Sequence, residues 1–302
     1  MARLVVSVPT QSEFDYISKY DVEPVMWKVD SPAPRQDLDI AVMPYFFDVK
    51  KLAYLEGMSP RLVQLASIGF DGVAEQAPAG LTIANAATVH ETATAELTLG
   101  LMLAAQREIP RMVRNQDRNH WENFRAVGLA DSTVVIVGVG GVGTAIAERL
   151  EPFEVNTVRV ASRERDDFRG HVYGIDQLPE LLPTADIVVL AVPLSDSTQH
   201  LADDAFFSQM RDDSLFVNIA RGKVADTEAL IRHAGRIRVA LDVVDPEPLP
   251  ENSPLWSNPA VLIAPHVGGW SQAQFPRHNA LVGRQIEHLL AGEEPENVVL
   301  IS

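Results

Sequence analysis

The chain has 302 residues and a net charge of −16, a length that suggests two domains with sizeable cores. The acidic balance argues against nucleic acid as the main partner, because phosphate binding needs a basic surface. No cysteine is present, so disulfides and thiolate metal sites are excluded, and we expect no metal. The first apolar run, Leu4–Val8, is too short for a signal sequence or a membrane span, and we expect a cytoplasmic location by default.

Short apolar runs of this kind alternate with helical patterns along the whole chain. Several runs are apolar throughout, as in strands that are buried on both faces of a parallel sheet. The alternation predicts βαβ units and therefore an α/β fold. The expected strands are Leu4–Val8, Asp39–Met43, Leu62–Ala66, Leu81–Asn85, Thr133–Val137, Thr157–Ala161, Asp186–Val192, Ser214–Ala220, Ile237–Val244 and Val261–Ala264.

A helical stretch over residues 92–115 separates the first four strands from the other six, and we expect it to bridge two domains. A second helix, over residues 277–290, follows the last strand and precedes a short tail. If the tail packs back on the first domain, that domain is discontinuous. The pattern therefore predicts two α/β domains, and it leaves open whether the tail belongs to the first of them.

A glycine-rich loop lies between the fifth strand and a helix. The strand residues Val134–Val137 continue directly into Gly138-Val139-Gly140-Gly141-Val142-Gly143, the GxGxxG pattern in its strand-to-helix context. Gly138 permits the tight turn, Gly140 lets the backbone approach a pyrophosphate, and Gly143 lets the helix pack closely on the strand. The helix N-terminus adds N–H donors for the phosphates. The pattern predicts a dinucleotide site, with a flavin, another nucleotide or an empty turn as the alternatives.

The end of the next strand predicts which nicotinamide cofactor is used. An enzyme that binds NAD carries Asp or Glu here to bind the ribose 2′-hydroxyl. In this chain Thr157–Ala161 ends in Ser162-Arg163, so no carboxylate repels a 2′-phosphate and Arg163 can bind one. A surface arginine is the alternative, since Arg165 and two aspartates follow closely. We expect NADP(H) to be preferred over NAD(H).

Three later strands end in candidate catalytic side chains. Arg221 follows the strand over 214–220, Glu247 follows the strand over 237–244, and His266 follows the strand over 261–264. Because ligands bind beyond the carboxyl ends of strands in open α/β sheets, these three residues are expected near the nicotinamide. His266 can donate a proton near neutral pH. Glu247 can hold the imidazole and stabilise its protonated form, and Arg221 can bind a substrate carboxylate and polarise an oxo group.

Other aromatic and imidazole side chains lack such a context. We expect Trp121 and Trp270 to be core or pocket-wall residues. The remaining histidines are expected to be surface or packing residues: His90, His120, His171, His200, His233, His278 and His288.

With these motifs in place, the sequence resembles the D-isomer-specific 2-hydroxyacid dehydrogenases, and within them the glyoxylate/hydroxypyruvate reductases. The resemblance covers most of the chain, and spaced motifs in this order are highly specific. They are Ser67-Ile68-Gly69-Phe70-Asp71, Thr94-Ala95-Glu96-Leu97, Gly138–Gly143, Val192-Pro193-Leu194 with Thr198, Asn218-Ile219-Ala220-Arg221-Gly222, Leu241-Asp242-Val243, Pro246-Glu247-Pro248-Leu249-Pro250 and Pro265-His266-Val267-Gly268-Gly269.

The resemblance implies two Rossmann-like or flavodoxin-like domains with parallel sheets and a cleft between them: a substrate domain made of both chain ends, residues 1–95 with 275–302, and a cofactor domain of residues 96–274. It also implies hydride transfer between NADP(H) and a small 2-oxo acid or D-2-hydroxy acid, in a homodimer. It implies that Arg221, Glu247 and His266 are catalytic, and that Arg221, His266 and the backbone N–H groups of Ile68 and Gly69 bind the substrate. With the glycine loop and Ser162-Arg163, the expected cofactor contacts are Val89, Thr94, Gly138, Gly140, Gly141, Val142, Gly143, Ser162, Arg163, Val192, Pro193, Thr198, Ile219, Ala220, Arg221, Asp242, His266 and Gly268.

Two departures from the family pattern and two alternative functions stay open. Ser162-Arg163 replaces the acidic residue of NAD-using members, and the segment Met43–Phe47 is unusually aromatic, which favours a 2-oxo acid bulkier than glyoxylate or is a feature of the core. Glu247 argues against formate dehydrogenase, a relative with Gln at this place. The alternatives are a non-catalytic NAD(P)H-sensing protein, like the corepressors built on this fold, and a dehydrogenase of another small anion such as phosphite.

Overall fold

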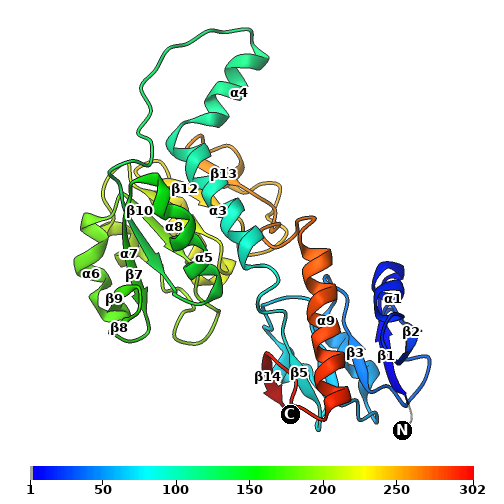
Figure 1. Cartoon of the computed structure of the whole chain (residues 1–302). Helices are drawn as coiled ribbons and strands as arrows, with labels where there is room; N and C mark the ends of the chain where they lie inside the picture. Colours follow the sequence, from blue (N-terminus) through cyan, green and yellow to red (C-terminus); the bar gives the residue numbers. More distant parts are fainter. Residues whose placement is uncertain (1–2) are drawn as a thin grey trace. The chain divides into compact units, whose positions relative to one another are not determined.

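The computed structural model describes residues 3–302, which form two compact units (Figure 1). The first unit contains the residues up to His90 and the C-terminal segment Ser271–Ser302, and the second contains Glu91–Trp270. Both boundaries fall a few residues before the expected ones at 95 and 275, because the helix at the first boundary already begins at Glu91. Both units are built on a mostly parallel sheet, so the predicted α/β fold is confirmed.

The sheet of the first unit has six strands in the order β14-β5-β4-β3-β1-β2. All neighbouring strands are parallel except β14, which is antiparallel to β5. Strand β2 was not expected, because Glu23 and Pro24 interrupt its apolar pattern; a proline is tolerated there since β2 is an edge strand. The strands are β1 (Leu4–Val8), β2 (Val22–Met26), β3 (Ile40–Val42), β4 (Leu62–Gln64), β5 (Thr82–Ala84) and β14 (Val298–Ile301).

Both chain ends build this first unit. Helix α9 (Gln274–Ala291) packs on α1 (Gln11–Ile17), and the apolar side chains of α9, Val282, Ile286 and Leu289, join the core on one face of the sheet. The C-terminal tail then forms β14 against β5. The unit is therefore discontinuous in sequence. Its other face is covered by the 3-10 helix Val49–Leu55 and by α2 (Val73–Gln76).

The sheet of the second unit has eight strands in the order β13-β12-β11-β10-β6-β7-β9-β8. All are parallel except β8, which forms an antiparallel hairpin with β9. This hairpin was not expected, because its sequence is dominated by charged residues. The strands are β6 (Thr133–Val137), β7 (Asn156–Ala161), β8 (Arg165–Asp167), β9 (Gly170–Gly174), β10 (Ile187–Leu190), β11 (Leu215–Asn218), β12 (Arg238–Leu241) and β13 (Val261–Ile263).

Helices cover both faces of this second sheet (Figure 1). One core lies under α3 (Glu91–Gln106) and α5 (Gly141–Leu150), and the other lies under three shorter helices. These are α6 (Leu178–Leu181), α7 (Asp204–Gln209) and α8 (Thr227–His233). The central strands are apolar on both faces, which explains why their sequences were recognisable.

The single helix expected over residues 92–115 is two helices, α3 and α4 (Ile109–Asp117). Glu108 between them has a left-handed backbone with a φ of 51°, and Pro110 in the first turn of α4 cannot continue the hydrogen bonding of α3. Helix α4 extends away from the sheet of the second unit (Figure 1). Trp121, just beyond it, is 89% exposed, and Trp270 is 55% exposed. Neither is therefore a core residue, and the expected role in a pocket wall stays a prediction. Among the described residues, no helix combines the length and the apolarity needed to cross a membrane.

Candidate active site

The glycine-rich loop makes the tight turn that its sequence predicts. Gly138 has a φ of 107°, and a Cβ atom there would lie 2.4 Å from the carbonyl oxygen of Ala191. A Cβ atom on Gly143 would lie 1.8 Å from the carbonyl oxygen of Gly138. Only glycine fits at either position, since real Cβ atoms do not approach so closely. The loop therefore allows α5 to begin directly beside the end of β6.

Gly140 fits the cofactor for the opposite reason. Nothing in the protein lies within 4 Å of the place where its Cβ atom would be. Gly140 precedes the first turn of α5, where free N–H groups and the helix dipole favour an anion. Packing within the protein thus does not require glycine at this position, whereas a pyrophosphate against the backbone would. The loop, including Gly141 and Val142, fits a dinucleotide.

The residues expected at the adenosine ribose are placed as the sequence suggests. Ser162 and Arg163 directly follow β7, and both are exposed. Strand β7 is the neighbour of β6, so this turn lies one strand away from the glycine loop at the same edge of the sheet. This is the place where the Rossmann fold presents the ribose.

The loop after β10 is held by Thr198. Its hydroxyl donates to the carbonyl oxygen of Pro193 at 2.6 Å and accepts from the backbone N–H of Ser195 at 2.8 Å. Thr198 is buried, so its visible role is to shape the Val192–Ser195 turn. A cofactor contact of Thr198, Val192 or Pro193 stays a prediction.

The turn that carries Arg221 depends on Asn218, for which the sequence motifs suggested no role. The buried side chain of Asn218 accepts a hydrogen bond from the N–H of Ala220 and donates one to the carbonyl of Arg221, both at 3.0 Å. Asn218 thereby closes the turn at the end of β11, next to the buried Ile219 and Ala220. Arg221 itself donates from Nη1 to the carbonyl of Ala220 at 2.6 Å. The sequence signal for this role was an asparagine at the end of an apolar strand.

Asp242 plays the same part for the loop of His266. Its two carboxylate oxygens accept from the N–H groups of Val267 at 2.8 Å and Gly268 at 2.9 Å, and its carbonyl accepts from the N–H of His266 at 2.8 Å. Burial raises the pKa of Asp242, and these two backbone hydrogen bonds partly offset the shift. A Cβ atom on Gly268 would lie 2.7 Å from this carboxylate and 3.3 Å from the methyl group of Thr94. Asp242 thus fixes the backbone on which His266 stands.

The imidazole of His266 pairs with the carboxylate of Glu247. Nδ1 of His266 lies 2.7 Å from Oε2 of Glu247, while Oε1 of Glu247 accepts from the N–H of Val244 at 3.2 Å. A carboxylate offers acceptors alone, so Nδ1 carries the hydrogen and Nε2 is left for proton transfer. The hydrogen bond to Glu247 raises the pKa of His266 against the opposing effect of burial. Burial raises the pKa of Glu247, but His266 and Arg221 together outweigh it, so that pKa lies below its usual value.

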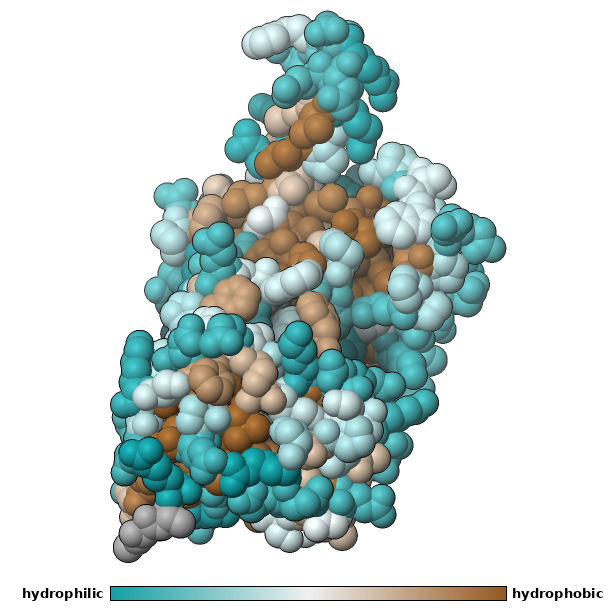
Figure 2. All heavy atoms as spheres, turned by 90° about the vertical axis from the view of Figure 1, so that its right-hand side faces the viewer, coloured by the Kyte–Doolittle hydropathy of each residue, from teal (hydrophilic) through white to brown (hydrophobic). Residues whose placement is uncertain are grey.

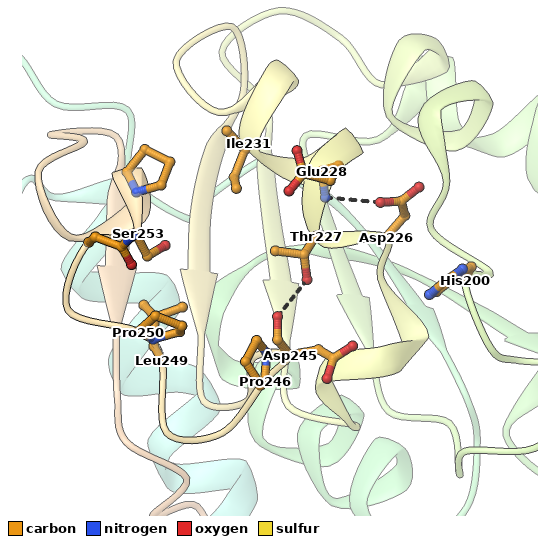
Figure 3. A pocket seen from close by; sticks show the side chains of 12 residues that line it. His200, Asp226, Thr227, Glu228, Ile231, Asp245, Pro246, Leu249, Pro250 and Ser253 are labelled. Atoms are coloured by element: carbon orange, nitrogen blue, oxygen red, sulfur yellow. Dashed lines mark hydrogen bonds between the residues drawn. The ribbon is translucent and has the colours of Figure 1, made fainter.

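A hollow of about 400 Å³ lies on the second unit behind the loop that carries Glu247 (Figure 3). Thr227 at the start of α8 donates from its hydroxyl to the carbonyl of Asp245 at 2.9 Å, and the indole of Trp256 donates to the carbonyl of Pro250 at 2.9 Å. These two bonds brace the loop on both sides of Glu247. Figure 3 shows the first of them, from Thr227 to Asp245, among the side chains that line the hollow.

The residues expected to bind the substrate carboxylate lie in the first unit, in the loop after β4. Asn85 donates to the carbonyl of Ile68 at 2.8 Å, and the hydroxyl of Ser67 donates to the carbonyl of Gly69 at 2.7 Å. Within the described chain, the N–H groups of Ile68 and Gly69 donate to no protein acceptor. The loop thus has its carbonyls engaged and two donors available, as an anion requires. Val89 is buried beside Ala86 and Leu281, and its cofactor contact stays a prediction.

The second unit therefore brings Arg221, Glu247 and His266 to the same edge of its sheet as the glycine loop. Comparison with known families agrees with this geometry. The model of the NAD-binding domain of the D-isomer specific 2-hydroxyacid dehydrogenases matches residues 99–268. The chain belongs to this family. The resemblance predicted from the motifs is confirmed, and the protein is an oxidoreductase of the 2-hydroxyacid dehydrogenase class.

Individual relatives match over nearly the full length of this family member. The glyoxylate reductase/hydroxypyruvate reductase of Mus musculus is 30% identical over 94% of this chain and 92% of its own. A solved structure of a protein from Thermus thermophilus superposes with a TM-score of 0.79 and 26% identity, covering 98% of this chain and 99% of the other. The NADPH-dependent glyoxylate/hydroxypyruvate reductase of Sinorhizobium meliloti, solved with NADP and malonate, shares the fold with a TM-score of 0.81 and 23% identity, covering 99% and 98% of the two chains.

Proposed function

We propose that this dehydrogenase reduces a small 2-oxo acid of the glyoxylate or hydroxypyruvate kind to the D-2-hydroxy acid, with NADPH as the preferred cofactor. The observation that carries the proposal is the 2.7 Å pair of His266 and Glu247, with Arg221 near enough to influence the charge of both. A proton donor with a raised pKa beside a permanent cation suits a reaction that makes an alkoxide next to a carboxylate. The name of the Mus musculus relative points to the same substrates.

In this proposal each residue has a defined role. Bound NADPH supplies the hydride that reduces the carbonyl carbon. Nε2 of His266 gives its proton to the carbonyl oxygen, and the carboxylate of Glu247 stabilises the imidazolium before that transfer. The guanidinium of Arg221 binds the substrate carboxylate and polarises the oxo group. The N–H groups of Ile68 and Gly69 stay expected substrate contacts, as the resemblance implies. In the reverse direction neutral His266 accepts the hydroxyl proton.

The preference for NADPH rests on Ser162 and Arg163. Both are exposed at the end of β7, and neither can repel a phosphate as a carboxylate would. A charge-assisted contact to a 2′-phosphate contributes about 1–3 kcal/mol, which is about ten- to a hundredfold in kcat/KM. The S. meliloti neighbour, whose structure holds NADP, is consistent with this preference.

We also propose that the enzyme is a homodimer that pairs through the arm formed by α4 and the residues up to 128. Ile109, Met112 and Val113 expose apolar side chains along α4, and Figure 2 shows a strip of apolar atoms along the arm at the top of the view. The arm is held in shape by Arg111, which binds Glu108 at 2.9 Å and Glu122 at 3.0 Å. An ordered apolar surface of this kind is typical of a subunit interface. Light scattering should give twice the chain mass, and Met112→Asp with Val113→Asp should give monomers.

The function is tested with a panel of 2-oxo acids, each assayed with NADPH and with NADH. We expect turnover of hydroxypyruvate or glyoxylate and a higher kcat/KM with NADPH. Binding of NADPH without turnover of any 2-oxo acid would instead favour a nucleotide-sensing protein. Reduction of NADP+ or NAD+ by phosphite, without turnover of any 2-oxo acid, would favour the other small-anion reaction. Equal or better efficiency with NADH would contradict the cofactor preference.

A further inference from the structure

The segment that follows β7 carries charges of alternating sign: Arg163, Glu164, Arg165 and Asp166. In an extended chain successive side chains point to opposite faces. The pairing of β8 with β9 sets Asp166 opposite His171 and Arg165 opposite Val172. Asp166 and His171 therefore share one face of the hairpin, and Arg165 lies on the other. The alternation places Asp166 and Arg165 on opposite faces, while Asp167 shares the face of Arg165.

The imidazole of His171 lies between the two carboxylates of this acidic face. Its Nδ1 lies 2.9 Å from Oδ1 of Asp166, and its Nε2 lies 3.2 Å from Oε1 of Glu164. The ring also packs edge-on against Tyr173, with 4.5 Å between the ring centroids. Strand β9 is parallel to β7 while β8 runs antiparallel to β9, away from the carboxyl edge. The contact with His171 thus draws the carboxylate of Glu164 away from the edge at which the ribose is expected.

The guanidinium of Arg165 lies toward that edge instead. Nη1 of Arg165 donates to the carbonyl of Arg163 at 3.4 Å, which brings the guanidinium back beside the end of β7. The remaining carboxylate of the hairpin, Asp167, is bound by Arg159 through two hydrogen bonds of 2.8 and 2.9 Å. Each of the three carboxylates of this hairpin is thereby held by a partner other than Arg163 or Arg165.

We propose that Arg165 binds the 2′-phosphate of NADP together with Arg163, and that His171 is a positioning residue that keeps Glu164 and Asp166 off these two arginines. The inference rests on the proposed preference for NADPH and extends it to residues outside the turn. Two guanidinium groups can share a phosphate dianion. A carboxylate released beside them would pair with the arginines and repel the phosphate. NADH lacks that phosphate, so its binding does not depend on either group.

The first test removes the second arginine. Arg165→Ala should raise the KM for NADPH about three- to tenfold, because the contact is exposed and screened, and should leave the KM for NADH within about twofold. Inhibition by 2′,5′-ADP should weaken by the same factor. Arg211→Ala is the matched control, since Arg211 is an exposed arginine paired with Asp186 ahead of β10. Arg211→Ala should change neither the KM for NADPH nor the KM for NADH.

The second test releases the carboxylates. His171→Phe keeps the ring against Tyr173 but removes both nitrogens, so the KM for NADPH should rise about three- to tenfold while the KM for NADH and kcat stay unchanged. Adding Glu164→Gln and Asp166→Asn to His171→Phe should restore the KM for NADPH. If the role of His171 is purely structural, the KM should rise equally for NADPH and NADH, and the changes at Glu164 and Asp166 should not restore it.

The outcomes separate this inference from the cofactor proposal. A wild-type enzyme that prefers NADH overturns the preference for NADPH, and this inference with it. A wild-type enzyme that prefers NADPH, but whose NADPH-to-NADH ratio is the same in Arg165→Ala and His171→Phe, overturns this inference alone. Unfolding temperatures equal to that of the wild type show that the variants are folded.

Discussion

Glu247 uses both of its carboxylate oxygens to fix His266: one lies 2.7 Å from Nδ1 of the imidazole, and the other accepts from the N–H of Val244 in its own loop. The carboxylate is thereby oriented before it acts on the ring. Because the pair raises the pKa of His266, the imidazolium persists to higher pH than it would alone. The same contact assigns the donor nitrogen, since Nε2 is the nitrogen that Glu247 does not occupy.

The pH dependence follows from this pair. Reduction needs protonated His266, so kcat/KM should fall as pH rises through the raised pKa of His266. Glu247→Gln removes the negative charge, which lowers that pKa, so the alkaline fall should move to lower pH. Oxidation of the hydroxy acid needs neutral His266, and its acid limb should move in the same direction. A profile that is only scaled down, with no displacement, would show that Glu247 does not tune His266.

The role of Arg221 is tested by keeping its charge and changing its shape. Arg221→Lys loses the planar fork that binds a carboxylate through two parallel hydrogen bonds, so kcat/KM for the 2-oxo acid should fall by about ten- to a hundredfold. The Kd of NADPH, measured by fluorescence, should barely change, because the glycine loop holds the cofactor. A large loss of NADPH affinity with unchanged substrate kinetics would mean that Arg221 serves the cofactor.

Asn218 can be tested against a matched asparagine at the other edge of the same sheet. Asn218→Ala removes the two hydrogen bonds that close the Arg221 turn, which should destabilise the fold by about 1–3 kcal/mol and raise the KM for the 2-oxo acid. Asn258 makes the equivalent pair of bonds ahead of β13, to Ala234 and Ala260. Asn258→Ala should destabilise the fold similarly and leave the KM unchanged. If Asn218→Ala and Asn258→Ala change the KM equally, Asn218 does not position Arg221.

The glycine loop offers a second matched pair. Gly143→Ala forces a Cβ atom against the carbonyl of Gly138 and should lower the free energy of unfolding by about 1–3 kcal/mol. Gly140→Ala meets no protein atom within 4 Å, so stability should be unchanged while the Kd of NADPH rises. Thermal unfolding and fluorescence titration measure the two effects. An unchanged Kd in Gly140→Ala would mean that no pyrophosphate approaches this position.

The elements predicted best from the sequence are those whose own residues determine their structure. Strand β6, apolar from Val134 to Val137, and the glycine pattern after it were placed correctly. Burial on both faces selects apolar residues, and a position without room for a Cβ atom selects glycine. The charged hairpin β8–β9 and the edge strand β2 were missed, since their pairing is set by neighbouring strands. The break between α3 and α4 depends on the left-handed backbone of Glu108, which the spacing of apolar residues does not reveal.

The candidate catalytic side chains could be proposed from local signals, because each lies in the loop that follows a predicted strand, and the structure brings Glu247 and His266 together. What could not be predicted is how they are held. The hydrogen bonds of Asn218 and Asp242 join residues that become neighbours only when the strands pair. The same is true of His171, which is exposed as expected, but whose position between two carboxylates across a hairpin no local signal reveals.

The central claim is that His266 supplies the proton in the reduction of a 2-oxo acid, and one measurement addresses it most directly. It compares kcat/KM for hydroxypyruvate with NADPH in the wild-type enzyme and in His266→Ala, with the Kd of NADPH measured in both. The account predicts that kcat/KM falls by about 10²- to 10⁴-fold while the Kd stays within a few fold. A variant that keeps near wild-type kcat/KM would contradict the account, because the proton would then come from another group.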